Sequence, residues 1–317
     1  MRRFPSTFRA RNLLACAALL LGPLVTPARA DILYVSLQNN TIAKITSAAS
    51  GSVFASSGLS NPFGLAFDSA GMLYAANDSG STIEKFTRSG VGSVFASTGL
   101  SGPIGLAFDS AGNLYAADNN GIAKFTPDGA GSVFAGGLSL SSSLAFDSAG
   151  NLYASNFNNR TIQKFTPDGV GTVFATALGS PRGLAFDSAG NLYTAISSNN
   201  TIEKFTSTGG VLSSTGSVFT SSGVNSPVSL AFDSAGNLYL ANGGNDTIEK
   251  YTSTGGVLSS SGTVFANSTN GVSGSPRFLA FTNDAGVPLP LANTPEPASV
   301  ALLGLGACLL AARRRKA

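Results

Sequence analysis

The chain has 317 residues, of which 38 are Gly, 43 % are hydrophobic and 11 % are charged, and it contains neither His nor Trp. This composition is typical of one repetitive all-β body rather than of two mixed domains. Because His is absent, the sequence excludes a Ser-His or Cys-His catalytic pair and any His-ligated zinc or iron.

The first 30 residues predict a secretory signal. A basic start is followed by an apolar stretch from Leu13 to Val25, and Ala28-Arg29-Ala30 precedes Asp31. This order of charged, apolar and small residues is typical of a signal that signal peptidase removes, with Ala28 and Ala30 as the small residues at the cleavage site. A lipoprotein signal at Cys16 is the weaker alternative, because almost no apolar segment precedes that cysteine.

Charge and cysteine are both unevenly distributed. The formal net charge of +3 comes from five Arg in the first 30 residues and from the cations at the C-terminus. The central body keeps ten Lys and Arg against sixteen Asp and Glu, a net charge of −6. An acidic body without a basic stripe is a poor partner for nucleic acid or anionic lipid. Both cysteines, Cys16 and Cys308, lie in apolar end segments, so we expect no disulfide, no thiolate metal site and no cofactor in the body.

The body consists of six copies of one unit. The string Leu-Ala-Phe-Asp-Ser-Ala-Gly recurs with its Asp at 68, 109, 147, 187 and 233, and a degenerate copy stands at 279–281. In each of the five complete copies of this string, a Tyr follows seven residues after the Phe. A sixth Leu-Tyr pair, Leu33-Tyr34, stands at the start of the body and has no Leu-Ala-Phe string before it. Each unit offers four short apolar runs rich in Val, Ile, Phe and Tyr, which predicts four strands.

Four strands in about 40 residues are typical of a propeller blade, and six copies predict a closed ring. The fold class predicted over residues 31–287 is therefore an all-β, six-bladed β-propeller of four-stranded blades. The body begins with a Leu-Tyr strand that lacks a preceding Leu-Ala-Phe strand, and it ends with a Leu-Ala-Phe strand that lacks a following Leu-Tyr strand. This arrangement predicts that the ring closes by strand exchange, with residues near 279–281 pairing beside Leu33-Tyr34. The repeated Asp-Ser-Ala-Gly links are predicted to be tight turns rather than calcium sites, because no Asp-x-Asp-x-Asp ladder accompanies them.

Variable loops predict where a ligand would bind. The links before the inner strands and after the second strands differ from blade to blade and share one face of the ring. The opposite face holds the repeated hairpins and two insertions around 211–212 and 257–258. The candidate ligand-binding residues on the variable face are Arg160, Arg182, Arg277, Asn77, Asp118, Asn156 and Asn242. The three Arg are its only cations, and guanidinium groups suit the carboxylates of an acidic polysaccharide or peptide.

The repeat Pro-x-Gly-Leu-Ala-Phe-Asp-x-Ala-Gly-Asn-Leu-Tyr, followed by Ile-x-Lys-Phe, resembles the NHL repeat and the gluconolactonase-type six-bladed propellers. The family's streptogramin lyases and peptide-amidating lyases depend on His, so the resemblance does not carry their chemistry to this chain. Gluconolactonase-type enzymes bind a metal through one Glu at the channel mouth. Here Glu84, Glu203 and Glu249 lie in third strands, where we expect them to pair with Lys on an exposed face, so no metal ligand is assigned.

The C-terminal segment has the pattern of a signal that determines where the protein is located. Pro295-Glu296-Pro297 ends a linker at 288–297, an apolar run covers 298–312, and a basic tail at 313–317 contains Arg313, Arg314 and Arg315. This order resembles the PEP-CTERM sorting signal of exopolysaccharide-producing Gram-negative bacteria, in which an exosortase recognises the tail. The resemblance implies export across the inner membrane, transient anchoring by a short transmembrane helix, and passage to the cell surface or extracellular matrix. An ordinary C-terminal membrane anchor is the alternative.

Two functional classes remain open. The first is a surface-displayed, non-catalytic binding or scaffold module whose partners are extracellular polysaccharide or matrix protein. The second is a metal-dependent lactone or ester hydrolase with Asp and Asn ligands only. A tight metal site with a large thermal shift would favour the hydrolase. We expect the binding module, without catalytic residues.

Overall fold

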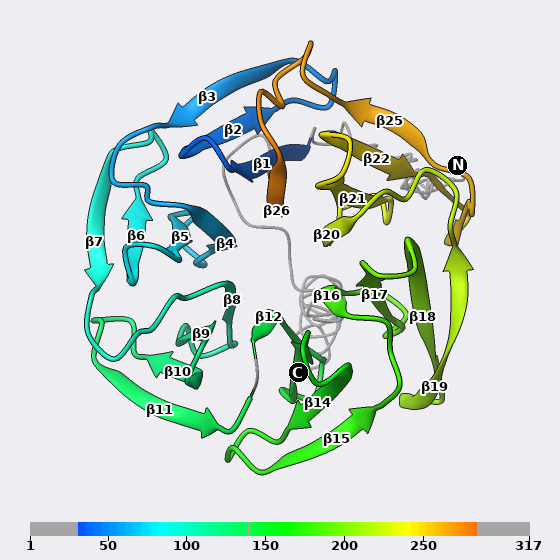
Figure 1. Ribbon diagram of the computed structural model, residues 1–317, viewed down its shortest axis with the longest axis horizontal. Coiled ribbons are helices and arrows are strands. Elements are labelled where there is room, and N and C mark those ends of the chain that lie inside the picture. Colours follow the sequence, from blue (N-terminus) through cyan, green and yellow to red (C-terminus); the bar gives the residue numbers. More distant parts are fainter. Residues whose placement is uncertain (1–30, 139, 284–317) are drawn as a thin grey trace, which may run out of the picture.

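The computed structural model describes residues 31–138 and 140–283, which form a ring of six four-stranded antiparallel sheets around a central axis (Figure 1). The predicted signal at 1–30 and the linker, apolar run and basic tail from 288 onward lie outside these residues. No helix long and apolar enough to cross a membrane occurs in the described part of the chain.

In each blade the strands follow one another from the axis to the rim. The blades, from inner to outer strand, are β26 (Pro276–Asn283), β1 (Asp31–Leu37), β2 (Thr41–Ile45) and β3 (Gly51–Ala55); β4 (Pro62–Phe67), β5 (Leu73–Asn77), β6 (Thr82–Phe86) and β7 (Gly92–Ala96); β8 (Gly105–Phe108), β9 (Leu114–Asp118), β10 (Gly121–Phe125) and β11 (Gly131–Gly136); β12 (Ser141–Phe146), β13 (Leu152–Asn156), β14 (Thr161–Phe165) and β15 (Gly171–Ala175); β16 (Pro181–Phe186), β17 (Leu192–Ile196), β18 (Thr201–Thr208) and β19 (Val211–Thr220); β20 (Pro227–Phe232), β21 (Leu238–Asn242), β22 (Thr247–Tyr251) and β25 (Thr263–Ala266). We number them blades 1 to 6 in this order. The two insertions lengthen the outer hairpin of blade 5 and add the short hairpin β23 (Ser253–Thr254) and β24 (Val257–Leu258) to blade 6.

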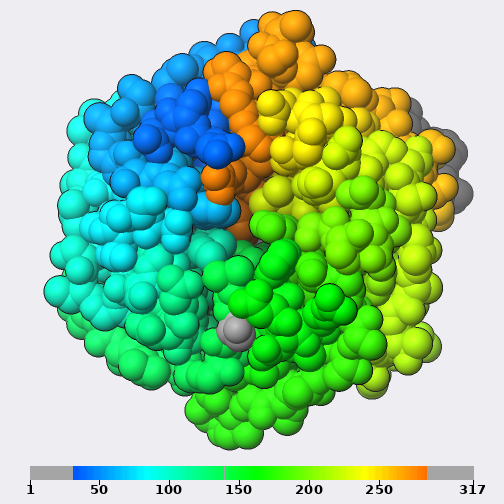
Figure 2. Space-filling view, in the orientation of Figure 1, coloured from blue at the N-terminus to red at the C-terminus, as the bar shows by residue number. Residues whose placement is uncertain are grey.

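Blade 1 closes the ring as the sequence predicts. Its inner strand β26 comes from the end of the body and pairs with β1, placing Leu33 opposite Phe281 and Val35 opposite Leu279. Figure 2 shows the orange segment of β26 lodged between the blue first blade and the yellow sixth blade. Side chains from both ends of the body are therefore buried in one apolar cluster with blade 6.

Aromatic side chains hold neighbouring blades together. Tyr34 contacts Phe54 of its own outer strand and Phe67 of the next inner strand, with ring centroids 4.9 and 5.1 Å apart in edge-to-face arrangements. Equivalent Tyr-Phe contacts recur at every junction in the ring. Such pairs add about 0.5–1.5 kcal/mol each beyond the burial of their area, so the repeated Tyr is a structural residue.

The repeated Asp residues stabilise the hairpins, in agreement with their predicted role as turn residues. Asp68 Oδ1 accepts hydrogen bonds from the backbone N–H groups of Ala70 and Met72 at 3.0 and 2.9 Å, and Gly71 adopts a positive φ of 78°. Lys85 Nζ lies 3.6 Å from the other carboxylate oxygen of Asp68. The same arrangement recurs in blades 3 and 4.

The expectation that the third-strand Glu residues pair with Lys on an exposed face is wrong. Glu84 and Glu249 are only 6 % and 5 % exposed, and neither has a hydrogen bond or an ion pair among the described residues. Lys85 turns instead to Asp68 and the ring of Tyr74. Burial raises the pKa of the Glu84 and Glu249 carboxyl groups above the usual range.

Candidate ligand-binding cavity

One position at the start of each inner strand lies next to the central axis. Around the ring these positions are occupied by Phe63, Ile104, Ser142, Arg182, Val228 and Arg277, of which all but the buried Ser142 are partly exposed. The next position is often Gly, which lets neighbouring strands approach. A Cβ on Gly64 would lie only 2.3 Å from the carbonyl oxygen of Ile104. Close packing of the inner strands therefore gathers these side chains around the central axis.

A cavity of about 440 Å³ opens on this face of the ring. Its walls come from blades 1, 2, 4, 5 and 6, which places it at the mouth of the central channel. The lining residues are Gln38, Phe63, Phe157, Ser180, Arg182, Ser197, Ser198, Ser226, Val228, Gly243, Ser275, Pro276 and Arg277. The set contains two Arg and no Asp, Glu, His or Cys, so this wall offers positive charge without a carboxylate.

Each arginine of the cavity lies over an aromatic ring from a neighbouring blade. The guanidinium carbon of Arg182 is 4.6 Å from the centroid of Phe157, and that of Arg277 is 4.0 Å from the centroid of Phe63. Neither forms an ion pair within residues 31–138 and 140–283. Stacking holds a guanidinium plane by its face and leaves the N–H edges free for an anion.

The two guanidinium groups are close enough to affect each other. Burial lowers the pKa of Arg182 below its usual value, and the positive charge of Arg277 lowers it further. Burial also lowers the pKa of Arg277, while the negative charge of Asp78 acts in the opposite direction. The Asp78 carboxylate accepts a hydrogen bond from Asn61 at 2.8 Å. The cavity therefore holds two partly dehydrated cations that an anionic ligand would stabilise.

Hydroxyl groups surround the arginines. Five Ser residues line the cavity, and three of their hydroxyls donate to nearby groups. Ser275 donates to the carbonyl of Gly243 at 3.1 Å, Ser197 to the carbonyl of Ser180 at 3.2 Å, and Ser198 to the side chain of Asn199 at 2.9 Å. A hydroxyl can still accept when it donates. The rim is therefore able to hydrogen-bond a hydroxylated ligand.

The structure brings together two of the predicted site residues and separates the others from them. Arg182 and Arg277 share the cavity. Arg160 is exposed in a turn with a positive φ of 56°, where its carbonyl accepts from the Leu178 N–H at 3.1 Å, and it does not line the cavity.

The predicted Asn and Asp residues lie at the ends of second strands, and three of the four bind the linkers that enter their own blades. Asn77, Asp118 and Asn242 accept from the N–H groups of Ser60, Ser101 and Asn225 at 3.1, 3.0 and 2.9 Å. Asn156 donates to Thr161 at 3.3 Å, and its Oδ1 has no partner in the part of the chain that the structure describes. All four side chains are buried and none lines the cavity.

Sequence reasoning missed the two aromatic rings. Phe63 stands in one of the variable links before the inner strands, and Phe157 lies in the variable loop after β13. Each could have been noticed as an apolar residue in a variable loop. Nothing in the sequence, however, assigns Phe157 to Arg182 or Phe63 to Arg277, since these pairs cross between blades.

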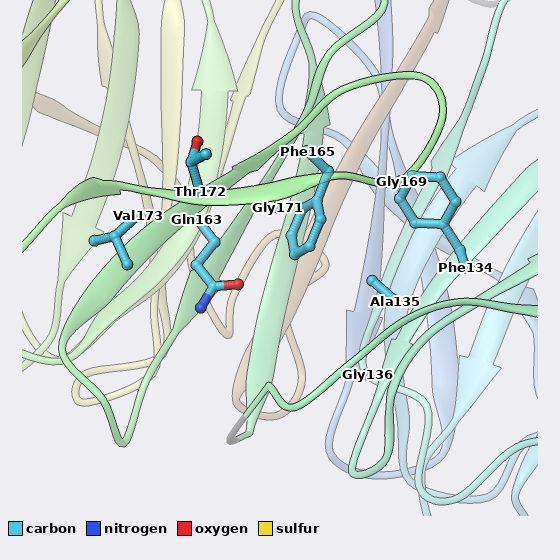
Figure 3. Close-up of a pocket in the computed structure, with 9 residues that line it drawn as sticks. All are labelled: Phe134, Ala135, Gly136, Gln163, Phe165, Gly169, Gly171, Thr172 and Val173. Atoms are coloured by element: carbon cyan, nitrogen blue, oxygen red, sulfur yellow. The ribbon is translucent and has the colours of Figure 1, made fainter.

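A second hollow lies near the rim, between blades 3 and 4 (Figure 3). It has a volume of about 490 Å³ and is lined by Phe134, Ala135, Gly136, Gln163, Phe165, Gly169, Gly171, Thr172 and Val173. The rings of Phe134 and Phe165 pack against each other with centroids 6.0 Å apart. Its lining has no ionisable side chain, so it offers neither charge recognition nor acid-base chemistry. In the described residues, no group of three or more His, Cys, Asp or Glu could hold a metal ion.

The fold and the C-terminal motif define a sorted six-bladed β-propeller. Residues 293–316 match the PEP-CTERM protein-sorting motif, which indicates export, a membrane-associated step with an exosortase-type enzyme, and a final location at the cell surface or outside the cell. No curated protein matches the chain by sequence.

Solved structures share the propeller fold. A chain of a nidogen/laminin complex superposes with a TM-score of 0.68 at 19 % identity, covering 79 % of this chain and 98 % of that one. Virginiamycin B lyase from Staphylococcus aureus gives 0.56 at 18 % identity, covering 71 % and 78 %. A streptogramin B lyase gives 0.57 at 17 % identity, covering 72 % and 78 %. These identities are low, so the likeness establishes the architecture alone.

Proposed function

We propose that this exported propeller is a non-catalytic binding module that holds an acidic polysaccharide of the extracellular matrix in its central cavity. The observation that carries the proposal is the pair of arginines, each stacked on a Phe and neither paired with a carboxylate. Free guanidinium edges bind carboxylates through two parallel hydrogen bonds. Ser hydroxyls around them suit the hydroxyl groups of a sugar chain.

The residues that line the cavity also support the proposal that the protein has no catalytic activity. A hydrolase or lyase site needs a group that moves a proton or activates water, and the cavity lining has no Asp, Glu, His or Cys. Among the structural relatives is a catalytically inactive histidine-to-alanine variant of virginiamycin B lyase, solved with quinupristin. This chain contains no His.

The test is a titration with a uronic-acid oligosaccharide, using variants matched in charge. Charge-assisted hydrogen bonds contribute about 1.5–3 kcal/mol each, so we expect Arg277→Ala to weaken binding at least about tenfold. Arg160→Ala removes the same charge from an exposed turn outside the cavity and should change affinity less than about twofold. An equal loss in both variants would show that the cavity is not the binding site.

The hydrolase alternative has its own measurement. Calcium, zinc or manganese should not raise the melting temperature of the purified ring, and lactones should not be hydrolysed in their presence. A large, saturable thermal shift together with metal-dependent lactone hydrolysis would replace the binding proposal with a metal-dependent hydrolase.

A further inference from the structure

The two ends of the described chain occupy the place of a missing hairpin. In blades 2 to 6 the inner strand and the second strand are joined by the Asp turn. In blade 1 the corresponding strands, β26 and β1, are not joined, and Asn283 lies opposite Asp31 at the open end of their ladder. The Asp31 carboxylate accepts from both the N–H and the hydroxyl of Ser234, in the Asp turn of blade 6, at 2.7 and 2.6 Å. Asp31 and Asn283 therefore both lie on the face of the ring that carries the Asp turns, which we call the hairpin face.

The cavity lies at the opposite end of the same two strands. Leu37 pairs with Pro276, and the Gln38 N–H donates to the Ser275 carbonyl at 3.1 Å. Gln38, Ser275 and Pro276 all line the cavity. Six steps of about 3.3 Å separate Asp31 from Leu37, so the cavity is about 20 Å from the face where the chain ends emerge.

The connection from the ring to the sorting segment is short. Asn283 ends β26, the sorting motif begins at residue 293, and the predicted apolar run begins at 298. Fourteen residues, from 284 to 297, can span at most about 50 Å. Because the described chain ends at Asn283 on the hairpin face, the shortest path to the bilayer puts that face next to it, whereas turning the cavity toward the bilayer would require the connection to pass around the ring.

We propose that the lipid surface faces the hairpin side of the ring while the sorting segment anchors the protein, so that the cavity points away from the membrane. The charges of the hairpin face are consistent with a position near the lipid surface, because Lys residues partly neutralise its carboxylates. Among its described residues, the face has no excess of positive charge that would bind it tightly to anionic lipid. Lys85, Lys124 and Lys164 lie 3.6, 3.9 and 4.0 Å from Asp68, Asp109 and Asp147. The cavity is thus accessible from outside before the tail is processed. This inference rests on the sorting motif and on the ladder of blade 1, and it is independent of what the cavity binds.

The experiment compares two cysteine positions at opposite ends of one strand. Ser110→Cys lies in the hairpin before β9 and Asn119→Cys in the loop after it, and both positions are exposed. The described body contains no Cys, so Cys16→Ser and Cys308→Ser leave a single thiol in each full-length protein. Each protein is labelled with a fluorescent donor and reconstituted with its tail intact into phosphatidylethanolamine/phosphatidylglycerol vesicles that contain an acceptor lipid.

The expected result is energy transfer from position 110 that is at least about twofold stronger than from position 119, because the positions are ~15 Å or more apart along β9. Cleavage of the tail should abolish both signals. A flexible insertion of about 30 residues within 284–292 should reduce the difference. Equal transfer, stronger transfer from position 119, or failure of the full chain to remain with the vesicles would overturn the proposal.

Discussion

Arg277, at the end of the body, lies 4.0 Å from the ring of Phe63 in blade 2, so one side-chain pair joins ring closure to the cavity. Arg277 belongs to β26, which reaches blade 1 only because it pairs with β1. The cavity is therefore complete only in a closed ring. Loss of β26 would remove both an inner strand and one of the two cations.

Closure predicts a strong effect of one apolar truncation. Leu279 is 4 % exposed and packs in the cluster that joins blades 1 and 6. We expect Leu279→Ala to lower the free energy of unfolding by about 2–5 kcal/mol, as for other buried leucines. Val133→Ala, at an outer-strand residue that is 84 % exposed, should change it by less than about 0.5 kcal/mol. Chemical denaturation measures both, and similar values for the two variants would refute closure by β26.

The close approach of the inner strands predicts a matched pair of glycine substitutions. Gly64→Ala places a Cβ 2.3 Å from a backbone carbonyl oxygen, so the strands must separate, at a cost of about 1–3 kcal/mol. A Cβ on Gly136 meets no atom within 4 Å. Gly136→Ala should therefore leave the melting temperature nearly unchanged. An unchanged melting temperature of Gly64→Ala would contradict the close packing of the inner strands at this position.

The hairpins predict the effect of removing one Asp. Asp147 accepts from the N–H groups of Ala149 and Asn151 and from the Asn151 side chain at 3.0, 2.8 and 2.8 Å. Asp147→Ala leaves these donors without their acceptor, and we expect a loss of about 1–3 kcal/mol in unfolding experiments. Asp147→Asn keeps one side-chain acceptor and should lose less. Equal stability of all three proteins would contradict the stabilising role of the turn.

The buried glutamates predict an unusual dependence of stability on pH. Burial raises the folded-state pKa of Glu84 and Glu249 above the unfolded value. Their contribution is fully present below the unfolded pKa and is lost as pH rises through the folded pKa. Glu84→Gln and Glu249→Gln should therefore melt at higher temperature than the wild type at pH 7, and this advantage should disappear near pH 4.

Blade 4 naturally has Gln at this position, since Gln163 occupies the third-strand position that corresponds to Glu84 in blade 2. Burial also raises the pKa of the Glu203 carboxyl, so Glu203→Gln should shift the melting temperature in the same direction. The matched control is Asp246→Asn, because Asp246 is exposed and its substitution should leave the melting temperature nearly unchanged. Thermal unfolding across pH 4 to 8 makes the comparison. A lower melting temperature of Glu84→Gln at pH 7 would mean that the ionised carboxylate stabilises the fold.

The repeats made the ring predictable and left the cavity largely unpredictable. The exchanged strand was predictable because Leu33-Tyr34 at the start of the body lacks an inner strand, and the Leu-Ala-Phe copy at 279–281 at the end lacks a second strand. Pairing the two completes one blade. Burial of Glu84 was not predicted, because its strand position alternates with apolar ones. The linker folds back over it, so a Cβ on Gly58 would lie 3.3 Å from its carboxyl carbon.

The predicted Asn and Asp site residues show the same limit. Asn77 stands in a variable loop region, but its amide binds the linker of its own blade, which only the folded chain reveals. Arg182 and Arg277 were predicted on one face because strand order fixes the face. Their meeting in one cavity and their stacking on Phe157 and Phe63 depend on contacts between blades that no local pattern encodes.

The most direct test of the central claim is the affinity of the ring for one polysaccharide before and after its carboxyl groups are reduced to alcohols. Charged guanidinium groups are predicted to bind the native uronate at least about tenfold more tightly than the reduced polymer, with the preference falling as salt rises from 20 to 150 mM. The preference should vanish in the variant that lacks Arg182 and Arg277. Equal affinity for both polymers, or a preference that survives in this variant, would contradict an anion-binding cavity.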